Sequence, residues 1–222
     1  QDILFDAGVL QLFPLTAAEF TYKFDAGKPQ ERLKFSNLLP YVESTRAAVK
    51  YMVEWKKPTK PCLMYQDDEY GKNVLDGFTQ QLDAMKLKPA SITTYKRGAS
   101  DFSAQVAKMK ADGCDLVVLG TILRETIGAI AEAKKLGWDV TFLGATPTNI
   151  PDTITLGKDV VDGFYAAGAF ETPYADTAKG KVKARAFGRI HNMKCKSGRK
   201  VRKMRKGMTL SGERAQKLRE LL

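Results

Sequence analysis

A regular alternation of short apolar runs with helical patterns, between residues 60 and 144, constrains this chain more than any other feature. The predicted order is strand 62–66, helix 71–86, strand 90–95, helix 101–111, strand 115–120, helix 124–136 and strand 140–144. Gly113 and Gly137 lie where a helix gives way to a strand, a position where a left-handed backbone favours glycine. Such alternation predicts an α/β fold with a parallel sheet, right-handed crossovers and helices on both faces.

The first unit of this alternation, Pro61–Phe78, also contains a candidate binding edge. Cys62–Tyr65 is mostly apolar, as a strand covered on both faces requires. Asp67–Glu69 follows at the expected helix start, where unpaired amides and the helix dipole favour negative charge. Ligands of open α/β sheets bind outside the carboxyl ends of the strands. Tyr70, which closes this turn, is therefore the first candidate ligand contact.

The chain before this alternation is predicted to consist of extended segments and loops. Residues 8–13, GVLQLF, form a strand that ends at Pro14 and leads into a loop of small and hydroxyl-bearing residues. Residues 33–39 are extended up to Pro40, where we place a lobe boundary.

One helix precedes the alternation and one strand follows it. The helix is predicted over residues 45–55, and its inward-facing side chains are Ala48, Tyr51, Met52 and Trp55. Trp55 and Trp138 are assigned to packing within the lobe. After Gly144, a polar loop and a short segment lead to a further strand over residues 163–170.

The positive charge of the chain is concentrated at one end. Residues 179–222 contain 16 Lys and Arg against two Glu, a net charge of +14, so the whole-chain value of +11 leaves −3 on residues 1–178. Disorder is the favoured interpretation of this basic tail, because low hydrophobicity and high charge oppose ordering. Contact with nucleic acid or an anionic membrane surface is the alternative.

Several functional classes are not expected from the sequence. No apolar run approaches the roughly 20 residues of a membrane-spanning helix. Cys62 and Cys114 are interpreted as buried free thiols, without a disulfide framework, and with Cys195 they show no metal spacing. His191 has no partner at ligand spacing. Nucleophile-elbow, phosphate-loop and dinucleotide motifs are lacking, so we expect no enzyme, catalytic residue, metal or cofactor.

Four segments together resemble the solute-binding components of branched-chain amino acid ABC transporters. They are YQDDEYGKNVLDGFTQQL, YKRGASDFSAQVAKMKADGCDLVVLG, AIAEAKKLGWDVTFLGA and DGFYAAGAFETPY. The resemblance covers about residues 8–178 and implies a type I periplasmic binding protein, whose two α/β lobes are joined by three crossovers and close on a small ligand. It also implies a periplasmic monomer that delivers its solute to membrane permease subunits, with nucleic acid an unlikely partner.

The resemblance also implies which residues contact the ligand. Pro14, Leu15, Thr16 and Ala17 match a first-lobe loop whose backbone and threonine hydroxyl hold the ligand carboxylate. The contacts implied from the second lobe are Tyr70, Thr121, Ile122 and Thr146.

Two of these positions depart from the pattern of amino acid binders. Thr146 replaces a carboxylate that pairs with the ligand's ammonium group, and Ile122 replaces an aromatic side chain. A closed cleft without a fixed anion should discriminate against amino acids. We therefore expect a carboxylate-bearing or neutral small molecule, unless Asp68 or Glu69 reaches inward and restores amine binding.

The resemblance covers only part of the family pattern. It lacks the first strand and helix series, of about a hundred residues in the family, and stops where the chain would return to the first lobe. The chain begins at Gln1, so processing or truncation is expected to have removed the true start, and it contains no signal peptide. The predicted domains are a first-lobe remnant (1–39), a complete second lobe (40–170), a return crossover (171–183) and a basic tail, disordered or read out of frame (184–222).

An alternative function keeps the same fold. A ligand-sensing regulator would use the basic tail to contact nucleic acid, but such regulators usually carry a helix-turn-helix unit, and none is visible in this sequence.

Overall fold

The computed structural model describes residues 6–168, 182–184 and 208–210. Contacts divide the chain into two units, Gln1–Phe170 and Glu171–Leu222. Of the second unit, the structure describes strands β8 (Val182–Ala184) and β9 (Met208–Leu210), which pair antiparallel. His191, Cys195 and nearly all of the basic tail lie outside the described residues, so the interpretations of these parts remain predictions.

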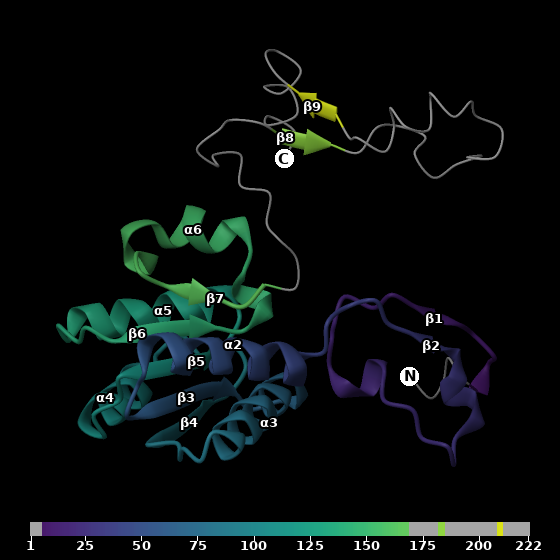
Figure 1. Ribbon diagram of the computed structural model, residues 1–222, viewed down its shortest axis with the longest axis horizontal. Helices are drawn as coiled ribbons and strands as arrows, with labels where there is room; N and C mark the ends of the chain where they lie inside the picture. Colours follow the sequence, from purple (N-terminus) through teal and green to yellow (C-terminus); the bar gives the residue numbers. More distant parts are fainter. Residues whose placement is uncertain (1–5, 169–181, 185–207, 211–222) are drawn as a thin grey trace. The chain divides into compact units, whose positions relative to one another are not determined.

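The first unit is built around a parallel sheet (Figure 1). Its described strands run in the order β4-β3-β5-β6-β7, and every pair is parallel. The strands are β3 (Pro61–Gln66), β4 (Ser91–Tyr95), β5 (Leu116–Gly120), β6 (Thr141–Gly144) and β7 (Tyr165–Ala166). This order confirms the predicted parallel α/β fold.

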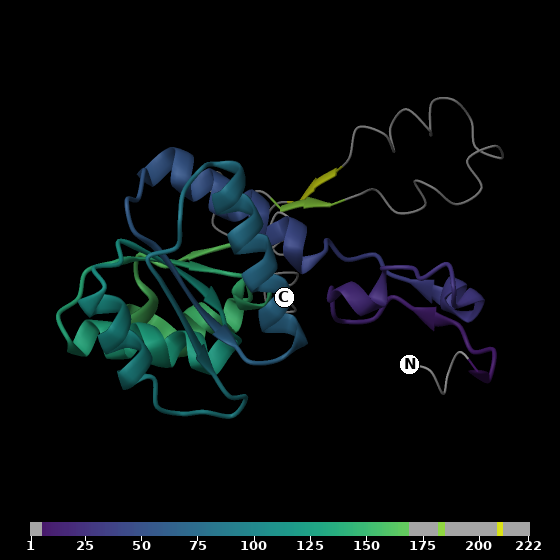
Figure 2. The same cartoon turned by 90° about the horizontal axis from the view of Figure 1, so that it is seen from below.

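Helices cover both faces of the sheet (Figure 2). They are α2 (Tyr41–Lys56), α3 (Glu69–Ala84), α4 (Ser103–Ala111), α5 (Leu123–Lys135) and α6 (Pro151–Gly157). Because side chains alternate along a strand, Leu63 of β3 packs with α2 and α3, whereas Cys62 and Met64 pack with α4 and α5. Both cores are apolar, which explains why β3 and β5 lack polar alternation, whereas β4 at the edge of the sheet alternates between buried and exposed residues.

The glycine positions between helices and strands follow the prediction. Gly113 and Gly137 have φ angles of 76° and 59°. Both end a helix in the left-handed region, where a side chain would be strained.

Helix α2 differs from its prediction in length and in the face that it buries. It starts at Tyr41, directly after Pro40, and its buried face contains Val49, Met52 and Val53. The inward assignment of Tyr51 and Trp55 is wrong, because these side chains are 62% and 48% exposed. The helical turn of about 100° per residue places them beside the buried stripe.

Trp55 and Trp138 pack at different places in the lobe. The Trp55 ring meets Tyr165 of β7 edge-on, with 5.3 Å between centroids, and lies under the Lys56 ammonium at 4.1 Å. Trp138 packs edge-on against Phe142 at 6.2 Å, on the α4 and α5 side of the sheet.

The region after β6 contains more helix than the sequence indicated. Helix α6 occupies what the sequence left as a short segment, and it begins with Pro151, whose fixed φ suits a first helical position. Two short 3₁₀ helices, η3 (Thr146–Thr148) and η4 (Lys158–Val161), flank it. Strand β7 has only two described residues, against the predicted 163–170.

Cys62 and Cys114 form a disulfide, with 5.9 Å between their Cα atoms. The prediction of two free thiols is therefore wrong. Cys62 lies at the start of β3, and Cys114 lies just before β5, the strand beside it. The register pairs Pro61 with Leu116, and this pairing brings together two cysteines that are 52 residues apart in sequence.

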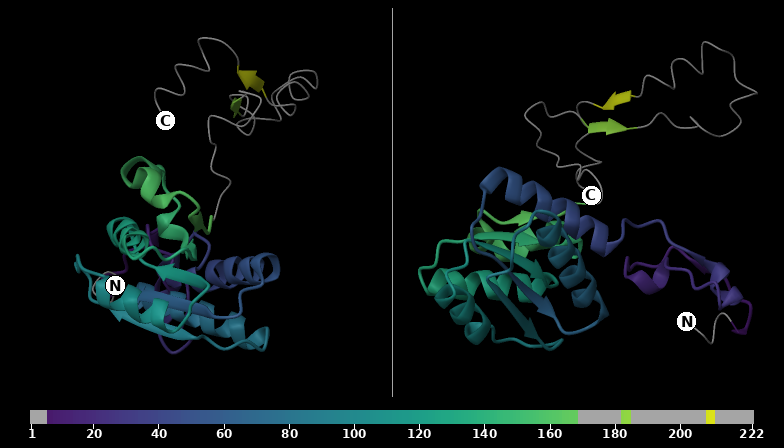
Figure 3. Two further views of the ribbon diagram at one scale, coloured as in Figure 1. Left: turned by 90° about the vertical axis from the view of Figure 1, so that its left-hand side faces the viewer. Right: turned by 60° about the horizontal axis from the view of Figure 1, so that its bottom comes forward.

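Residues before α2 form a small separate layer (Figure 3). Strands β1 (Gln11–Leu12) and β2 (Lys34–Phe35) pair in parallel. The 3₁₀ helices η1 (Glu19–Thr21) and η2 (Pro29–Leu33) lie between them in sequence.

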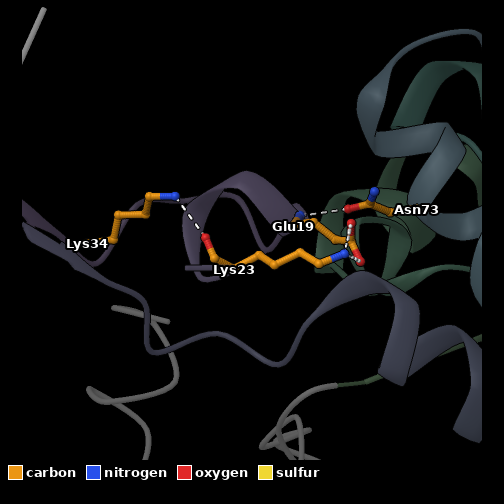
Figure 4. A network of polar contacts seen from close by, with 4 residues as sticks. All are labelled: Glu19, Lys23, Lys34 and Asn73. Carbon is orange, nitrogen blue, oxygen red and sulfur yellow. Dashed lines mark hydrogen bonds and ion pairs between the residues drawn. The ribbon is translucent and has the colours of Figure 1, made fainter. Parts of the chain in front are cut away.

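Two hydrogen bonds tie this layer to the main sheet unit. The Tyr41 amide donates to the Ala17 carbonyl at 3.2 Å. The Glu19 amide donates to Asn73 Oδ1 of α3 at 2.9 Å (Figure 4).

Candidate functional site

The carboxyl ends of β3, β4 and β5 meet at one edge, which we call the carboxyl edge. The register pairs Gln66 with Tyr95 and Tyr65 with Gly120. Thr121 follows Gly120 directly, and helices α3 and α5 begin just beyond the ends of β3 and β5. Residues far apart in sequence are thus gathered where parallel α/β proteins bind ligands.

The start of α3 approaches β3 closely. The Gly71 amide donates to the Asp68 carboxylate at 2.9 Å, which confirms a helix-capping role for this acid. A Cβ atom placed on Gly71 would lie 1.8 Å from the carbonyl oxygen of Gln66. Only glycine allows this approach, and the approach fixes the position of the neighbouring Tyr70.

Tyr70 lies between two other predicted contacts, Ala17 and Thr121. Its hydroxyl donates to the Thr121 carbonyl at 3.0 Å, and its ring packs edge-on against Tyr41, with 4.9 Å between centroids. Tyr70 also packs against the buried cluster formed by Ala17, Ala18 and Tyr41. Burial, followed by the neighbouring Tyr41, Tyr95, Asp68 and Glu125, holds the Tyr70 pKa well above its ordinary value.

Thr121 and Ile122 lie at the start of α5. Thr121 is fully buried, and its hydroxyl lies 2.5 Å from that of Thr126. The Thr126 hydroxyl donates to the Ile122 carbonyl at 2.8 Å. Because Thr126 uses its hydrogen for that carbonyl, Thr121 is the donor of the shared bond. In this state the Thr121 side chain supports the helix start.

Thr146 begins the 3₁₀ helix that follows β6, and it contacts α2. Its hydroxyl donates to Ser44 Oγ at 3.0 Å, and Ser44 Oγ donates to the Tyr41 carbonyl at 3.1 Å. These bonds link the loop after β6 to the same Tyr41 that packs against Tyr70.

The predicted first-lobe contacts differ among themselves. Ala17 is buried beside Tyr70, whereas the Leu15 side chain is 98% exposed. Thr16 Oγ1 accepts a long bond of 3.4 Å from the Ala18 amide, a local turn of the kind that hydroxyl residues favour. The structure thus brings Ala17, Tyr70 and Thr121 together and leaves Leu15 apart.

Three buried residues at the carboxyl edge were missed by sequence reasoning. Gln66, Tyr95 and Glu125 are 3%, 3% and 6% exposed. Within the described residues, Gln66 Oε1 and Glu125 Oε2 have no hydrogen-bond partner, whereas the Tyr95 hydroxyl accepts a hydrogen bond from the Ile122 backbone. The sequence signal was a polar residue at each strand end or helix start, but exposed caps have the same signal. Burial, then Glu125 and Asp68, raise the Tyr95 pKa.

The two acids that were expected to restore amine binding are occupied or exposed. Asp68 accepts from Gly71 through Oδ1, and through Oδ2 it accepts from Gln66 Nε2. Glu69 is exposed. Glu125 is therefore the acid of this edge that is both buried and incompletely paired.

The described part of the chain contains no group of three or more His, Cys, Asp or Glu arranged to hold a metal ion. Across the same residues, no helix is both long and apolar enough to cross a bilayer.

Comparison with known proteins agrees with this architecture. A family model described as periplasmic binding protein matches residues 21–192. An amino acid binding protein of Pseudomonas aeruginosa is 26% identical over 145 residues, covering 53% of this chain and 38% of the relative. A leucine-, isoleucine-, valine-, threonine- and alanine-binding protein of the same species is 24% identical over 166 residues, covering 74% and 43%.

Among solved structures, a branched chain amino acid ABC transporter protein of Thermus thermophilus with bound valine has a similar fold. Its TM-score is 0.69 at 22% identity, and the match covers 79% of this chain and 45% of that one. The chain spans about two fifths of the length of the curated relatives.

These relatives are solute-binding proteins and not enzymes, and their family implies an extracytoplasmic location. The parallel sheet, its helical layers and the family match together lead to one assignment: this chain belongs to the periplasmic binding protein family and has the type I fold of that family.

Proposed function

We propose that this chain acts in solute capture for an ABC importer, binding a small amino acid-like or carboxylate-bearing molecule between two lobes. The observation that carries this proposal is that Tyr70 packs against the cluster of Ala17, Ala18 and Tyr41 and donates a hydrogen bond to Thr121. Contacts expected from two different lobes therefore meet at one tyrosine.

The ligand would be held from both sides of this contact. Backbone amides of residues 15–17 and the Thr16 hydroxyl suit a carboxylate, because N–H and O–H donors are strengthened by an ionised acceptor. Tyr70, Thr121, Ile122 and Thr146 would line the opposite wall. A ligand that touches both walls favours the closed arrangement, since it binds that state more tightly.

The proposed partners are membrane permease subunits, and the proposed state is a monomer without nucleic acid. The Cys62–Cys114 disulfide supports an extracytoplasmic role, because disulfides persist in oxidising compartments. The proposed domain division retains a second lobe over residues 40–170, within the first compact unit.

Calorimetry with leucine, valine, benzoate and 4-methylpentanoate tests this function. We expect saturable 1:1 heat from at least one compound. Tyr70→Phe should lose affinity roughly tenfold, because it removes the hydroxyl and with it a neutral hydrogen bond at the proposed site. Tyr51→Phe is the matched control, because Tyr51 is 62% exposed on the outer side of α2. Absence of saturable heat from every compound would overturn the proposal.

A further inference from the structure

A cavity of about 750 Å³ lies at the amino ends of β5, β6 and β7, at the opposite end of the sheet from the carboxyl edge. Asp115 precedes β5, Asp139 precedes β6 and Asp162 precedes β7, and all three line this amino-end cavity. Its volume falls within the roughly 300–1,000 Å³ of small-molecule sites. The residues assigned to solute capture do not line it. A ligand of this cavity would therefore be a separate one.

The wall of the amino-end cavity is partly aromatic. Its aromatic lining consists of Trp138, Phe142, Phe164 and Tyr165. One cation of the chain already uses this surface, because the Lys56 ammonium lies 5.3 Å from the centroid of the Tyr165 ring. Aromatic faces attract cations that lie within about 6 Å of the ring centroid. The wall therefore suits a molecule that combines an apolar body with a positive charge.

The charged groups around the cavity also favour a cation. Three Asp against two Lys give the lining a net charge of −1. Within the described residues, the carboxylates of Asp139 and Asp162 form neither a hydrogen bond nor an ion pair. The two lysines are directed elsewhere: Lys134 Nζ donates to a backbone carbonyl at 2.5 Å, and Lys56 lies over aromatic rings. Two negative charges at the cavity are thus left for a ligand.

The helices that end beside the cavity have the same preference. Helix α2 ends at Lys56 and α5 ends at Lys135, and both helix ends contribute lining residues. The C-terminal end of a helix carries unpaired carbonyl groups and the negative end of the helix dipole, which favour cations. Helices α3 and α5 begin at the carboxyl edge, where the dipole has the opposite sign. The two ends of the sheet are therefore suited to ligand groups of opposite charge.

We propose that the amino-end cavity binds a small organic cation with an apolar body, such as an aromatic or aliphatic amine, and that Asp139 and Asp162 hold its positive charge. This site lies apart from the proposed solute site and adds a second ligand to the one captured there. The competing explanation is that the two aspartates only keep exposed loops hydrated. In that case, neutralising them would change no ligand affinity.

The first test compares three probes that share a phenylalkyl body and differ in charge. They are 2-phenylethylammonium, the neutral 2-phenylethanol and the anionic 3-phenylpropanoate, and calorimetry measures their affinities. We expect the amine to bind at least about fivefold more tightly than the alcohol, and the acid to bind most weakly. Equal affinities, tighter binding of the acid, or no saturable heat from the amine would each overturn the proposal.

The second test neutralises the two carboxylates. In the double variant Asp139→Asn and Asp162→Asn, the amine should weaken at least about fivefold, and the alcohol should be unaffected. The control double variant is Asp83→Asn and Asp152→Asn, which changes the net charge equally at exposed sites outside the cavity. It should keep the preference for the amine. A preference that survives in both double variants, or is lost equally in both, contradicts the site.

The third test locates the bound amine. Trp55→Phe leaves Trp138, a lining residue, as the single tryptophan. Its emission should change saturably with the midpoint that calorimetry gives. Tyr70→Phe, at the carboxyl edge, should leave the amine affinity unchanged. Heat without a change in Trp138 emission, or amine binding lost in Tyr70→Phe, would place the amine elsewhere and overturn the proposal. Solute capture would stand in either case, because leucine and the related compounds test it separately.

Discussion

A carboxylate lies near each end of β5, and the surrounding chain pairs the two carboxylates differently. Before β5, the Asp115 carboxylate accepts from the Thr59 amide at 2.6 Å, the Thr59 hydroxyl at 2.9 Å and the Lys60 amide at 2.9 Å. Beyond the other end of β5, the Glu125 carboxylate is more deeply buried, and one of its oxygens has no partner in the described residues. The acid before β5 is therefore paired by donors of the chain itself, whereas the acid beyond β5 keeps one unpaired oxygen.

The pKa shifts follow this contrast. Burial raises the Asp115 pKa, but hydrogen bonds from Thr59 and Lys60 outweigh it, so the net pKa is lowered. At the carboxyl edge burial outweighs a hydrogen bond from the Ile122 backbone, and the pKa of Tyr95 is raised. The comparison teaches that donors from the chain satisfy the carboxylate at the amino end of β5. At the carboxyl edge, by contrast, the described residues leave Glu125 Oε2 unpaired.

The largest expected effect comes from removing the disulfide between Cys62 and Cys114, near the amino ends of β3 and β5. Replacing both Cys62 and Cys114 with Ala should lower the free energy of unfolding by roughly 4 kcal/mol, because it frees a loop of 52 residues in the unfolded chain. Urea unfolding with and without a reductant measures this. Reductant should destabilise the unmodified chain and leave the double variant unchanged. If reductant left the stability of the unmodified chain unchanged, the disulfide would not stabilise the fold.

The next largest loss of stability is expected from disturbing the close approach of α3 to β3 at the carboxyl edge. Gly71→Ala should cost about 3 kcal/mol, because the new methyl group meets the Gln66 carbonyl and the backbone must shift. Lys72→Ala, an exposed change one residue along α3, is the control and should be nearly neutral. A Gly71→Ala variant as stable as this control would show that the approach of α3 to β3 is not tight.

Removing the Asp115 carboxylate, which accepts three hydrogen bonds, should have an intermediate effect on stability. We expect Asp115→Ala to lose about 2 kcal/mol at neutral pH, since three donors lose their acceptor. A lowered pKa stabilises the fold above the ordinary value of 3.8, and this contribution disappears on acidification. The gap between the two proteins should therefore narrow below pH 3.8. Asp76→Ala, at an exposed site of α3, should show no such gap.

The smallest effect concerns alkaline stability. The raised Tyr95 pKa means that stability is fully present below the ordinary value of 10.0 and falls as pH rises beyond it. Tyr95→Phe should therefore unfold less readily than the unmodified chain at one pH unit above that value, by about 1 kcal/mol. Tyr51→Phe, at an exposed tyrosine, should give no gain. If both variants gained the same alkaline stability, burial of Tyr95 would not be the cause of the gain.

The sequence predicted those parts of the fold that depend on local pattern. Strand-to-helix alternation places β3 to β6 within a few residues, because apolar runs covered on both faces and helical periodicity are properties of short windows. The same logic located Tyr70 beyond a strand end, and the family resemblance implied Thr121; the structure joins the two by a hydrogen bond.

What the sequence did not predict depends on how distant elements align. The Cys62–Cys114 bond requires the register of β3 against β5, and an odd number of cysteines concealed it. The burial of Glu125 requires α5 to be in place, since an acid in a first helical turn is ordinarily exposed. Tyr51 and Trp55 were misassigned because the hydrophobic character of a side chain does not reveal which part of α2 faces the sheet.

The placement of the two tryptophans gives each helical layer its own optical reporter. The chain has only two: Trp55 lies under the Lys56 ammonium and meets Tyr165 of β7 edge-on, and Trp138 packs on the α4 and α5 side of the sheet. Fluorescence of single-tryptophan variants therefore distinguishes loosening of one layer from loosening of the other. Solvent quenchers should reach the half-exposed Trp55 before Trp138 as long as the lobe remains folded.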